Sequence, residues 1–303
     1  MKKKRKKKEK LIQQIRWHPN QTWIGVARDS NIEIYDFHLE KIYEFVNDGL
    51  ACICSFDFEG WDHVLACYYM GDIFKWCIST GQLVSKISTF YKCSTILSYQ
   101  PDQYFIGTDY GGVFSQSKTE LFIMRDRVTC MTFSDREQCR WVVGCYDGII
   151  GICQHSLLIK IIHVDFRVFS VDGFGSDLIV GGRSSTMGIT QSMDHEWIIK
   201  TKTRSKSWFS PNIVCTTPQR IFMGTDTGCI VEMDPILGIN MSCFSKREIL
   251  PIRSLLISPD HLFFYYSSES RLERHFRFPI LQSLFWRVSN ISFSLVKKMA
   301  NYL

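Results

Sequence analysis

Short runs of alternating hydrophobic and polar residues recur along the whole chain, and each run is bounded by Gly, Asp, Asn or Ser. The stretch from Ile15 to Phe37 shows the unit. It holds a strand-like run, a loop, an apolar run that ends on small residues, a tight turn, and an alternating run that ends on an aromatic residue. Alternation with period two, rich in Val, Ile, Phe, Tyr and Trp, is typical of β-strands. The pattern therefore predicts an all-β protein.

This unit is repeated along the chain. Equivalent turn positions follow one another at spacings between 37 and 43 residues, at Ser30, Gly71, Gly111, Gly148, Ser185, Gly228 and Ser270. A fourth apolar run follows each aromatic-ended strand, for example LIKIIH from Leu158. A period of about 40 residues with four strands is typical of a WD40-type β-propeller blade. We therefore expect a seven-bladed WD40-type β-propeller over residues 11–290, with strands A, B, C and D in each blade.

Small residues stand at recurring places in these units. Glycine ends the second strand at Gly107, Gly144, Gly181 and Gly224. Neighbouring blades crowd at that depth, so we expect close packing, rather than a positive φ, to require glycine there. The tight turns also carry Gly and Asp. We expect the following to be structural residues of the blade turns: Gly71, Asp109, Gly111, Asp147, Gly148, Asp226 and Gly228.

The chain begins with a dense basic segment. Residues 2–10 hold eight basic residues and one acidic residue, a local charge of +7, whereas the whole chain carries +6, so residues 11–303 sum to −1. A block of like charge stays extended, so residues 1–10 are expected to be a disordered tail. Such a tail suits a nuclear localisation signal, contact with nucleic-acid phosphates, or both, or it is only a solvated segment with no binding partner. Its basic residues are Lys2, Lys3, Lys4, Arg5, Lys6, Lys7, Lys8 and Lys10.

Two further basic clusters are candidate contacts with RNA or a partner. The segment TKTRSKSWF is expected in the connection between blades five and six, where it meets phosphates and a base or is only a solvated loop. Its candidate residues are Lys200, Lys202, Arg204, Lys206 and Trp208. In the last blade, Arg271, Arg274 and Arg277 are expected on one face of a strand. There they face solvent or an acidic partner, or protect the strand edge.

The motifs of common catalytic and metal sites are missing from the sequence. It has no GxxxxGK[ST], HExxH or GxSxG pattern, and its 12 cysteines form no CxxC pair. No apolar stretch approaches the 18 or so residues that span a membrane, and LIQQIRWHP is too polar for a signal peptide. We therefore expect a protein that is not an enzyme, with no cofactor, metal, small-molecule substrate or membrane contact. Cysteines within strands suit a reducing nuclear or cytosolic compartment.

The repeats resemble WD40 repeats, although the Gly-His and Trp-Asp pairs of that family are almost absent and Tyr35-Asp36 is the nearest match. More narrowly, IRWHPNQTWIGVARDSNIEIYDF and GDIFKWCISTGQLVSKI resemble the first blades of the cirhin family, WD40 subunits of the U3-containing small-subunit processome. This resemblance covers about 70 residues and thins after Gly112. Members of that family carry two propellers, whereas this chain has room for one.

The resemblance implies a scaffold in the nucleus and nucleolus that brings early factors to the 5′ region of pre-ribosomal RNA. Its partners would be other processome proteins, with pre-rRNA and the U3 particle as further contacts. Two other roles remain open from the sequence: an adaptor that presents substrates to a ubiquitin ligase or chromatin complex, and an RNA-binding protein in its own right. How the ring closes is also open. We expect a fourth strand of the last blade at 283–288, and a closing strand or short helix at 291–303.

Overall fold

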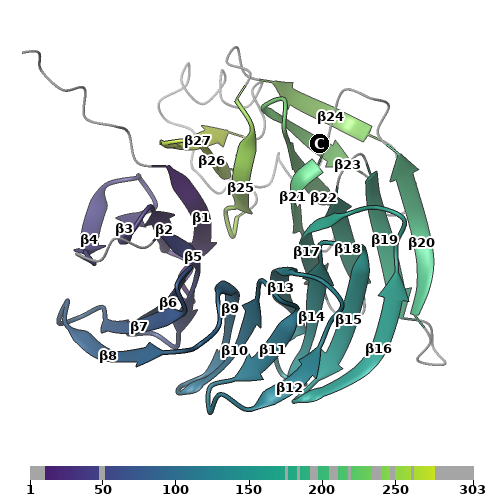
Figure 1. Ribbon diagram of the computed structural model, residues 1–303. Coiled ribbons are helices and arrows are strands. Elements are labelled where there is room, and N and C mark those ends of the chain that lie inside the picture. The colour runs from purple at the N-terminus through teal and green to yellow at the C-terminus, as the bar shows by residue number, and fades with distance from the viewer. Residues whose placement is uncertain are drawn as a thin grey trace, which may run out of the picture.

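The protein is a ring of antiparallel β-sheets (Figure 1). The computed structural model describes residues 11–47, 52–174, 177–182, 185–191, 197–204, 211–217, 220–233, 240–245, 250–260 and 263–276. These residues form strands β1 to β27 in seven sheets, and none of them is helical. Within each sheet the strands follow chain order, from the strand nearest the central opening to the strand at the rim. We therefore call them A, B, C and D from the centre outward.

Blades one to three occupy the first part of the chain. Their strands are β1 (Ile12–Trp17), β2 (Trp23–Arg28), β3 (Asn31–Asp36), β4 (Lys41–Phe45), β5 (Ile53–Glu59), β6 (His63–Tyr68), β7 (Asp72–Cys77), β8 (Leu83–Ser88), β9 (Cys93–Gln100), β10 (Gln103–Thr108), β11 (Gly112–Ser115) and β12 (Glu120–Ile123).

The remaining sheets complete the circle. Their strands are β13 (Val128–Asp135), β14 (Arg140–Cys145), β15 (Ile149–Gln154), β16 (Leu157–His163), β17 (Val168–Phe174), β18 (Asp177–Gly182), β19 (Ser185–Gln191), β20 (Trp197–Arg204), β21 (Pro211–Thr216), β22 (Ile221–Thr225), β23 (Cys229–Met233), β24 (Asn240–Ser245), β25 (Ile252–Ile257), β26 (Phe263–Ser268) and β27 (Arg271–Phe276).

The number of complete blades differs from the prediction. Six sheets have four described strands, whereas the seventh, β25–β27, has three. The structure therefore shows six complete blades rather than seven. The expected fourth strand of the last blade, residues 283–288, lies outside the described residues, as do the tail at 1–10 and the segment 291–303.

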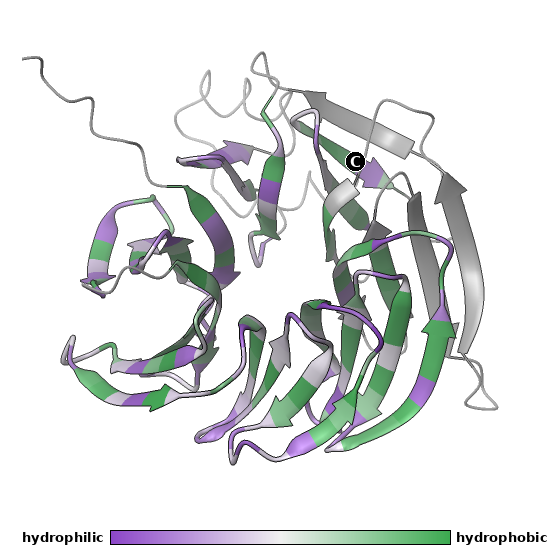
Figure 2. Ribbon diagram, in the orientation of Figure 1, coloured by the Kyte–Doolittle hydropathy of each residue, from purple (hydrophilic) through white to green (hydrophobic). Residues whose placement is uncertain are grey.

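Hydrophobic side chains fill the spaces between neighbouring blades. Figure 2 shows hydrophobic residues along much of β14 and β15 in blade four. Trp141 of β14 is fully buried and stacks on Phe105 of blade three, with ring centroids 4.4 Å apart. Its indole Nε1–H donates to the carbonyl oxygen of His155 at 2.8 Å, so the polar atom of this buried ring is satisfied. A blade thus buries both of its faces against its neighbours. This explains why successive residues of a B strand are apolar.

The glycines that end the B strands are needed for packing. A Cβ added to Gly107 would lie 2.6 Å from Val128 Cγ1 of the next blade, and one added to Gly144 would lie 2.7 Å from Val168 Cγ1. Neither glycine has a positive φ. The structure therefore confirms that the spacing between blades, and not the backbone conformation, excludes a side chain at these positions.

Polar side chains on the A strands join several neighbouring blades. Gln14 Oε1 accepts the N–H of Phe56 at 2.9 Å, and Asp57 Oδ2 accepts the N–H of Ser98 at 2.9 Å. Further round, Asp172 Oδ2 accepts the N–H of Thr216 at 2.7 Å. Each pair is separated by 41 to 44 residues, close to one repeat. The repeat length therefore brings these donors and acceptors together around the opening.

The last described sheet packs directly on the first blade and closes the ring. Ser254 Oγ on β25 accepts the N–H of Ile15 on β1 at 3.1 Å, and Trp17 Nε1–H donates to the carbonyl oxygen of Ile257 at 2.7 Å. Tyr265, fully buried, lies in one hydrophobic cluster with Ile12. The four strands of blade one follow one another in sequence. The N–H of Ile12 also donates to the carbonyl oxygen of Glu269 at 2.7 Å. Among the described residues, closure therefore uses side-chain contacts and a backbone hydrogen bond between blades, and no exchanged strand.

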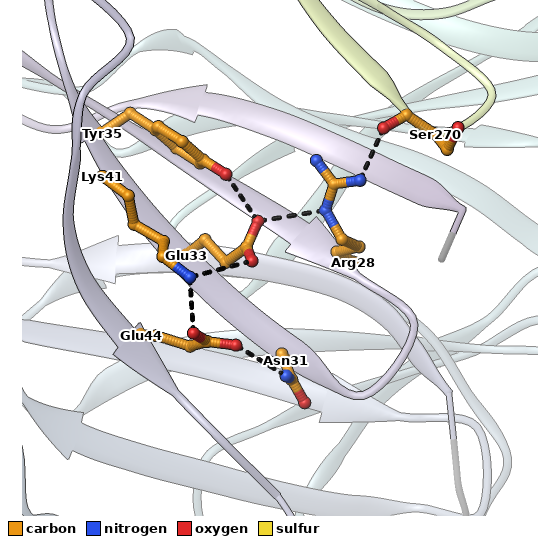
Figure 3. Close-up of polar contacts among 7 residues, drawn as sticks. All are labelled: Arg28, Asn31, Glu33, Tyr35, Lys41, Glu44 and Ser270. Atoms are coloured by element: carbon orange, nitrogen blue, oxygen red, sulfur yellow. Dashed lines mark hydrogen bonds and ion pairs between the residues drawn. The ribbon is translucent and has the colours of Figure 1, made fainter. Parts of the chain in front are cut away.

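A polar network in blade one reaches across the same seam (Figure 3). The buried Glu33 accepts hydrogen bonds from Arg28 Nε at 3.0 Å and from the Tyr35 hydroxyl at 2.7 Å. Arg28 Nη1 also donates to the carbonyl oxygen of Ser270 in the last described sheet. Lys41 lies 3.6 Å from the second Glu33 oxygen. The carboxylate is thus paired and hydrogen-bonded, as a buried charge must be, and it orients Arg28 towards the neighbouring blade.

Candidate binding face

One face of the ring carries the turns between B and C strands together with the connections from each D strand to the next A strand. We call it the B–C face. The two kinds of loop touch: Gly71 O of a B–C turn accepts the N–H of Thr89 in the following connection at 2.9 Å. A Cβ on Gly148 would lie 2.5 Å from the carbonyl oxygen of Val164, in the connection that follows. This crowding, together with a φ of +91°, explains the glycine in that turn.

Aromatic and basic side chains alternate across this face over blades two to five. We call this set the aromatic–basic row; it consists of Tyr69, Lys92, Tyr110, Arg127, Tyr146 and Arg167. Lys92 Nζ lies 5.1 Å from the centroid of the Tyr69 ring. The guanidinium carbons of Arg127 and Arg167 lie 5.3 Å and 4.7 Å from the centroid of Tyr146. These are cation–π distances. Each contact therefore restricts the orientation of both the tyrosine ring and the basic side chain.

The blade repeat sets the spacing of the row. The tyrosines come from B–C turns, whereas each basic residue directly precedes an A strand. The N–H of Tyr146 donates to the carbonyl oxygen of Arg127 at 2.9 Å, and the N–H of Asp109 donates to that of Lys92 at 3.0 Å. One backbone bond, repeated in successive blades, therefore places a basic side chain beside the B–C turns of blades three and four.

A broad, open groove runs through the middle of the row. Its volume is about 520 Å³, and it is lined by Lys92, Asp109, Tyr110, Asp126, Arg127 and Tyr146. The Tyr110 side chain is 68% exposed. The hydrogen bond from Lys92 to the Tyr69 hydroxyl favours the charged amine and raises the pKa of Lys92. The groove therefore offers flat aromatic surface next to fixed positive charge.

Acidic groups balance the charge of the row. Asp126 Oδ1 accepts the N–H of Arg127 at 2.6 Å, and Asp147 Oδ1 accepts the N–H of Ile149 at 3.2 Å. Asp109 also lines the groove. These three carboxylates offset the charges of Lys92, Arg127 and Arg167. The described part of the face is thus rich in cations and aromatic rings without a large net positive charge.

The face also exposes large apolar side chains beside the row. Phe90 is 96% exposed and Met70 is 68% exposed. They flank the contact between Gly71 and the connection at Thr89, so both belong to one small area of surface. Large exposed apolar groups gathered in one place are typical of surfaces that bind another molecule.

The central channel is a second cavity, of about 260 Å³, lined by the A strands. Most of its charged side chains bind other residues of the ring. Arg16 Nη1 lies 3.5 Å from Asp57 Oδ1. Burial raises the pKa of Asp172, although Thr216 donates two hydrogen bonds to its carboxylate. The polar lining therefore serves the joints between blades, and the B–C face is the better candidate for binding.

The described residues contain no group of three or more His, Cys, Asp or Glu side chains that could hold a metal ion. Among the same residues, no helix is long and apolar enough to cross a membrane.

The two basic clusters predicted from the sequence are not part of the aromatic–basic row, and the predicted placement of each is wrong. Lys200, Lys202 and Arg204 lie within strand β20, not in a connection, because KTKTR alternates basic and β-branched residues and continues the strand. Their side chains, and all of Lys206 and Trp208, lie outside the described residues.

The arginines of the last described sheet do not share a face. Arg271 and Arg274 are three residues apart on the regular strand β27, so they point to opposite sides. Arg274 lies over Phe263, its guanidinium carbon 4.8 Å from the ring centroid, and donates to the carbonyl oxygen of Phe37 at 2.9 Å. It therefore supports the seam of the ring. Arg277 and the tail residues Lys2 to Lys10 lie outside the described residues.

The turn residues lie where the repeats place them, between B and C strands. Gly71, Gly111, Gly148 and Gly228 all have positive φ, and Asp109, Asp147 and Asp226 stand one or two positions before a glycine. Sequence reasoning missed the row that these turns carry. Its signal was present: Tyr69 and Tyr146 occupy the same place in their repeats, as do Lys92 and Arg127.

No protein-family model and no curated protein matches the sequence. Many solved structures match the fold. One is the β-propeller domain of Cps50 (Swd1) from Myceliophteria thermophila, with a TM-score of 0.75 and 9% sequence identity, covering 87% of this chain and 96% of that chain. At this identity the likeness shows the fold alone. The chain thus has a β-propeller fold.

Proposed function

We propose that the protein is a non-enzymatic propeller scaffold of ribosome biogenesis, which acts in the nucleolus within the small-subunit processome. The observation that carries the scaffold role is the B–C face. It gathers Phe90, Met70 and the aromatic–basic row on a ring whose blades are bonded to one another at the centre. A rigid ring that exposes a binding surface is suited to a scaffold, because little conformational entropy is lost when a partner binds.

The choice of assembly is supported by the sequence. The first two blades carry the residues that resemble the cirhin family, from Ile15 to Phe37 and from Gly71 to Ile87. The basic segment at residues 2–10 suits import into the nucleus and contact with pre-rRNA. Other processome proteins are the proposed partners, with pre-rRNA and the U3 particle as further contacts.

The test is recovery of the tagged full-length chain from cells at moderate salt, with sequencing of the retained RNA and identification of the retained proteins. We expect U3 RNA, the 5′ region of pre-rRNA and processome subunits. Recovery of ubiquitin-ligase or chromatin subunits without those RNAs would contradict the assignment and favour an adaptor role.

A matched pair of variants tests whether the B–C face makes the contact. Met70→Ser with Phe90→Ser removes two exposed side chains from this face and should leave the fold intact. We expect it to reduce recovery of the partner proteins. Trp61→Ala removes an exposed aromatic side chain from the β5–β6 turn on the opposite face, and it should recover them as the unmodified chain does.

A further inference from the structure

We propose that the aromatic–basic row is a binding site for single-stranded RNA, in which bases stack on the tyrosine rings and guanidinium planes while the N-terminal basic segment attracts the phosphates. The choice of RNA over single-stranded DNA rests on the proposed function. The site itself stands on the geometry of the face, and it is tested with purified protein and synthetic nucleic acid, so its outcome does not depend on the assembly.

Stacking surface is the first part of the argument. Tyr110 exposes 68% of its surface and lines the groove, and Tyr69, 42% exposed, lies under Lys92. Arg127 and Arg167 both lie over the ring of Tyr146 and so present planar guanidinium groups at its side. Aromatic rings and guanidinium planes are the platforms on which proteins stack unpaired bases. The blade repeat spaces these platforms across four blades.

The attachment point of the tail is the second part. Leu11 is the first described residue, and its carbonyl oxygen accepts the N–H of Asp29, in the B–C turn of blade one, at 3.1 Å. Leu11 therefore lies at the same face that carries the row. Residues 2–10, which precede it in the sequence, carry a charge of +7.

The two parts contribute different physical terms. Because Asp109, Asp126 and Asp147 offset the charge of the row, attraction for phosphate comes chiefly from the tail. The row contributes stacking, which varies little with salt, whereas release of counterions by the tail makes binding fall steeply with salt. A duplex hides the faces of its bases, so it can use the tail but not the row. The proposal thus predicts two separable effects.

The experiment measures binding of the purified full-length chain to a fluorescent oligouridine of about 12 nucleotides, by anisotropy, between about 50 and 300 mM salt. Tyr69→Ala with Tyr110→Ala should weaken binding about tenfold or more at every salt concentration and leave the slope against log salt unchanged. Deleting residues 2–10 should instead flatten the slope by about 0.7 for each phosphate that the tail no longer neutralises.

Three controls keep the result specific. Tyr110→Phe retains the ring and should bind as the unmodified chain does. Trp61→Ala, on the opposite face, should have no effect. Duplex RNA of the same length should bind more weakly, with an affinity that the tyrosine variants do not change.

Several results would overturn the proposal. Unchanged binding by the tyrosine double variant would show that the tail alone holds RNA. If the same variant lost a protein partner from cells while binding RNA normally, the row would be a protein-docking surface instead. Equal affinity for oligodeoxythymidine would overturn the assignment to RNA.

Discussion

The backbone N–H of Tyr146 donates to the carbonyl oxygen of Arg127 at 2.9 Å. This bond ties the B–C turn of blade four to the connection that enters the same blade. Asp109 and Lys92 make the equivalent bond in blade three. A local backbone contact, repeated once per blade, therefore builds a surface that spans several blades, and its composition depends on which side chains stand at two positions of each repeat.

The turn beneath this surface should not tolerate a side chain. Gly148 has a φ of +91°, and its added Cβ would lie 2.5 Å from the carbonyl oxygen of Val164. We expect Gly148→Ala to lower the free energy of unfolding by about 2–4 kcal/mol, measured by urea denaturation. Gly60→Ala is the control, because Gly60 has a φ of +63° with no atom within 4 Å of an added Cβ. It should cost about 1 kcal/mol. Equal costs would show that backbone strain alone accounts for both.

At the contact between the last described sheet and blade one, two side chains donate to the same carbonyl oxygen, so their contributions to the free energy of unfolding should be coupled. The Phe37 oxygen accepts from the Tyr265 hydroxyl at 3.0 Å and from Arg274 Nη1 at 2.9 Å. Either donor alone can satisfy it, so Tyr265→Phe should cost little, and Arg274→Ala should cost chiefly the contact of its guanidinium group with the Phe263 ring. Together they leave a carbonyl group unsatisfied, and the double variant should lose about 1 kcal/mol more than the sum. Strict additivity in urea denaturation would contradict this account of closure.

The contact between blades one and two contains a histidine that should make the stability of the fold depend on pH. His18 is buried; its Nδ1 accepts the N–H of Asn20 at 3.1 Å, and its Nε2–H donates to the carbonyl oxygen of Trp61 in blade two at 3.0 Å. Burial lowers the pKa of His18 below the ordinary 6.5. The unfolded chain therefore takes up the proton first as pH falls, so stability is full above about pH 6.5 and declines below it.

The measurement is the melting temperature as a function of pH. The unmodified chain should lose stability between about pH 6.5 and 5, while His18→Gln, which keeps a donor for the Trp61 carbonyl oxygen, should give a flatter profile. Identical slopes for the two chains would show that His18 does not carry this pH dependence.

The cysteines of the channel should react slowly. Burial raises the pKa of Cys54 to about 12 and that of Cys130 to about 11, so almost no thiolate is present at pH 8. Exposed Cys52 should be alkylated first by iodoacetamide, as followed by mass spectrometry. In urea all three should react at similar rates. Rapid alkylation of Cys54 in the folded chain would contradict its placement at the channel wall.

The sequence predicted those features that depend on one repeat at a time. Strand alternation and turn residues mark the blades, and small residues such as Gly107 mark the close contacts between them, because each follows from local geometry. The basic cluster from Lys200 was misplaced for a local reason too. The charge of KTKTR favours a loop, whereas its alternation is that of a strand, and in the structure the alternation prevails.

Features that depend on two blades at once could not be found in this way. Asp57 gives no sign in the sequence that it accepts the N–H of Ser98, 41 residues later. Likewise, Lys92 and Tyr69 are ordinary loop residues until the fold stacks one over the other. An aligned comparison of the repeats would have shown which positions share a face, but the partner of each side chain is set by the angle between blades.

The most direct test of the account is hydrogen exchange of the native assembly, purified through the tagged chain and compared with the free chain. If partners bind the B–C face, backbone amides should exchange more slowly in the assembly than in the free chain at residues 69–71, 89–92, 109–111, 124–127 and 146–148. Protection confined to the opposite face, at the turns around Trp61 and residues 79–81, with the B–C face unchanged, would contradict the central claim.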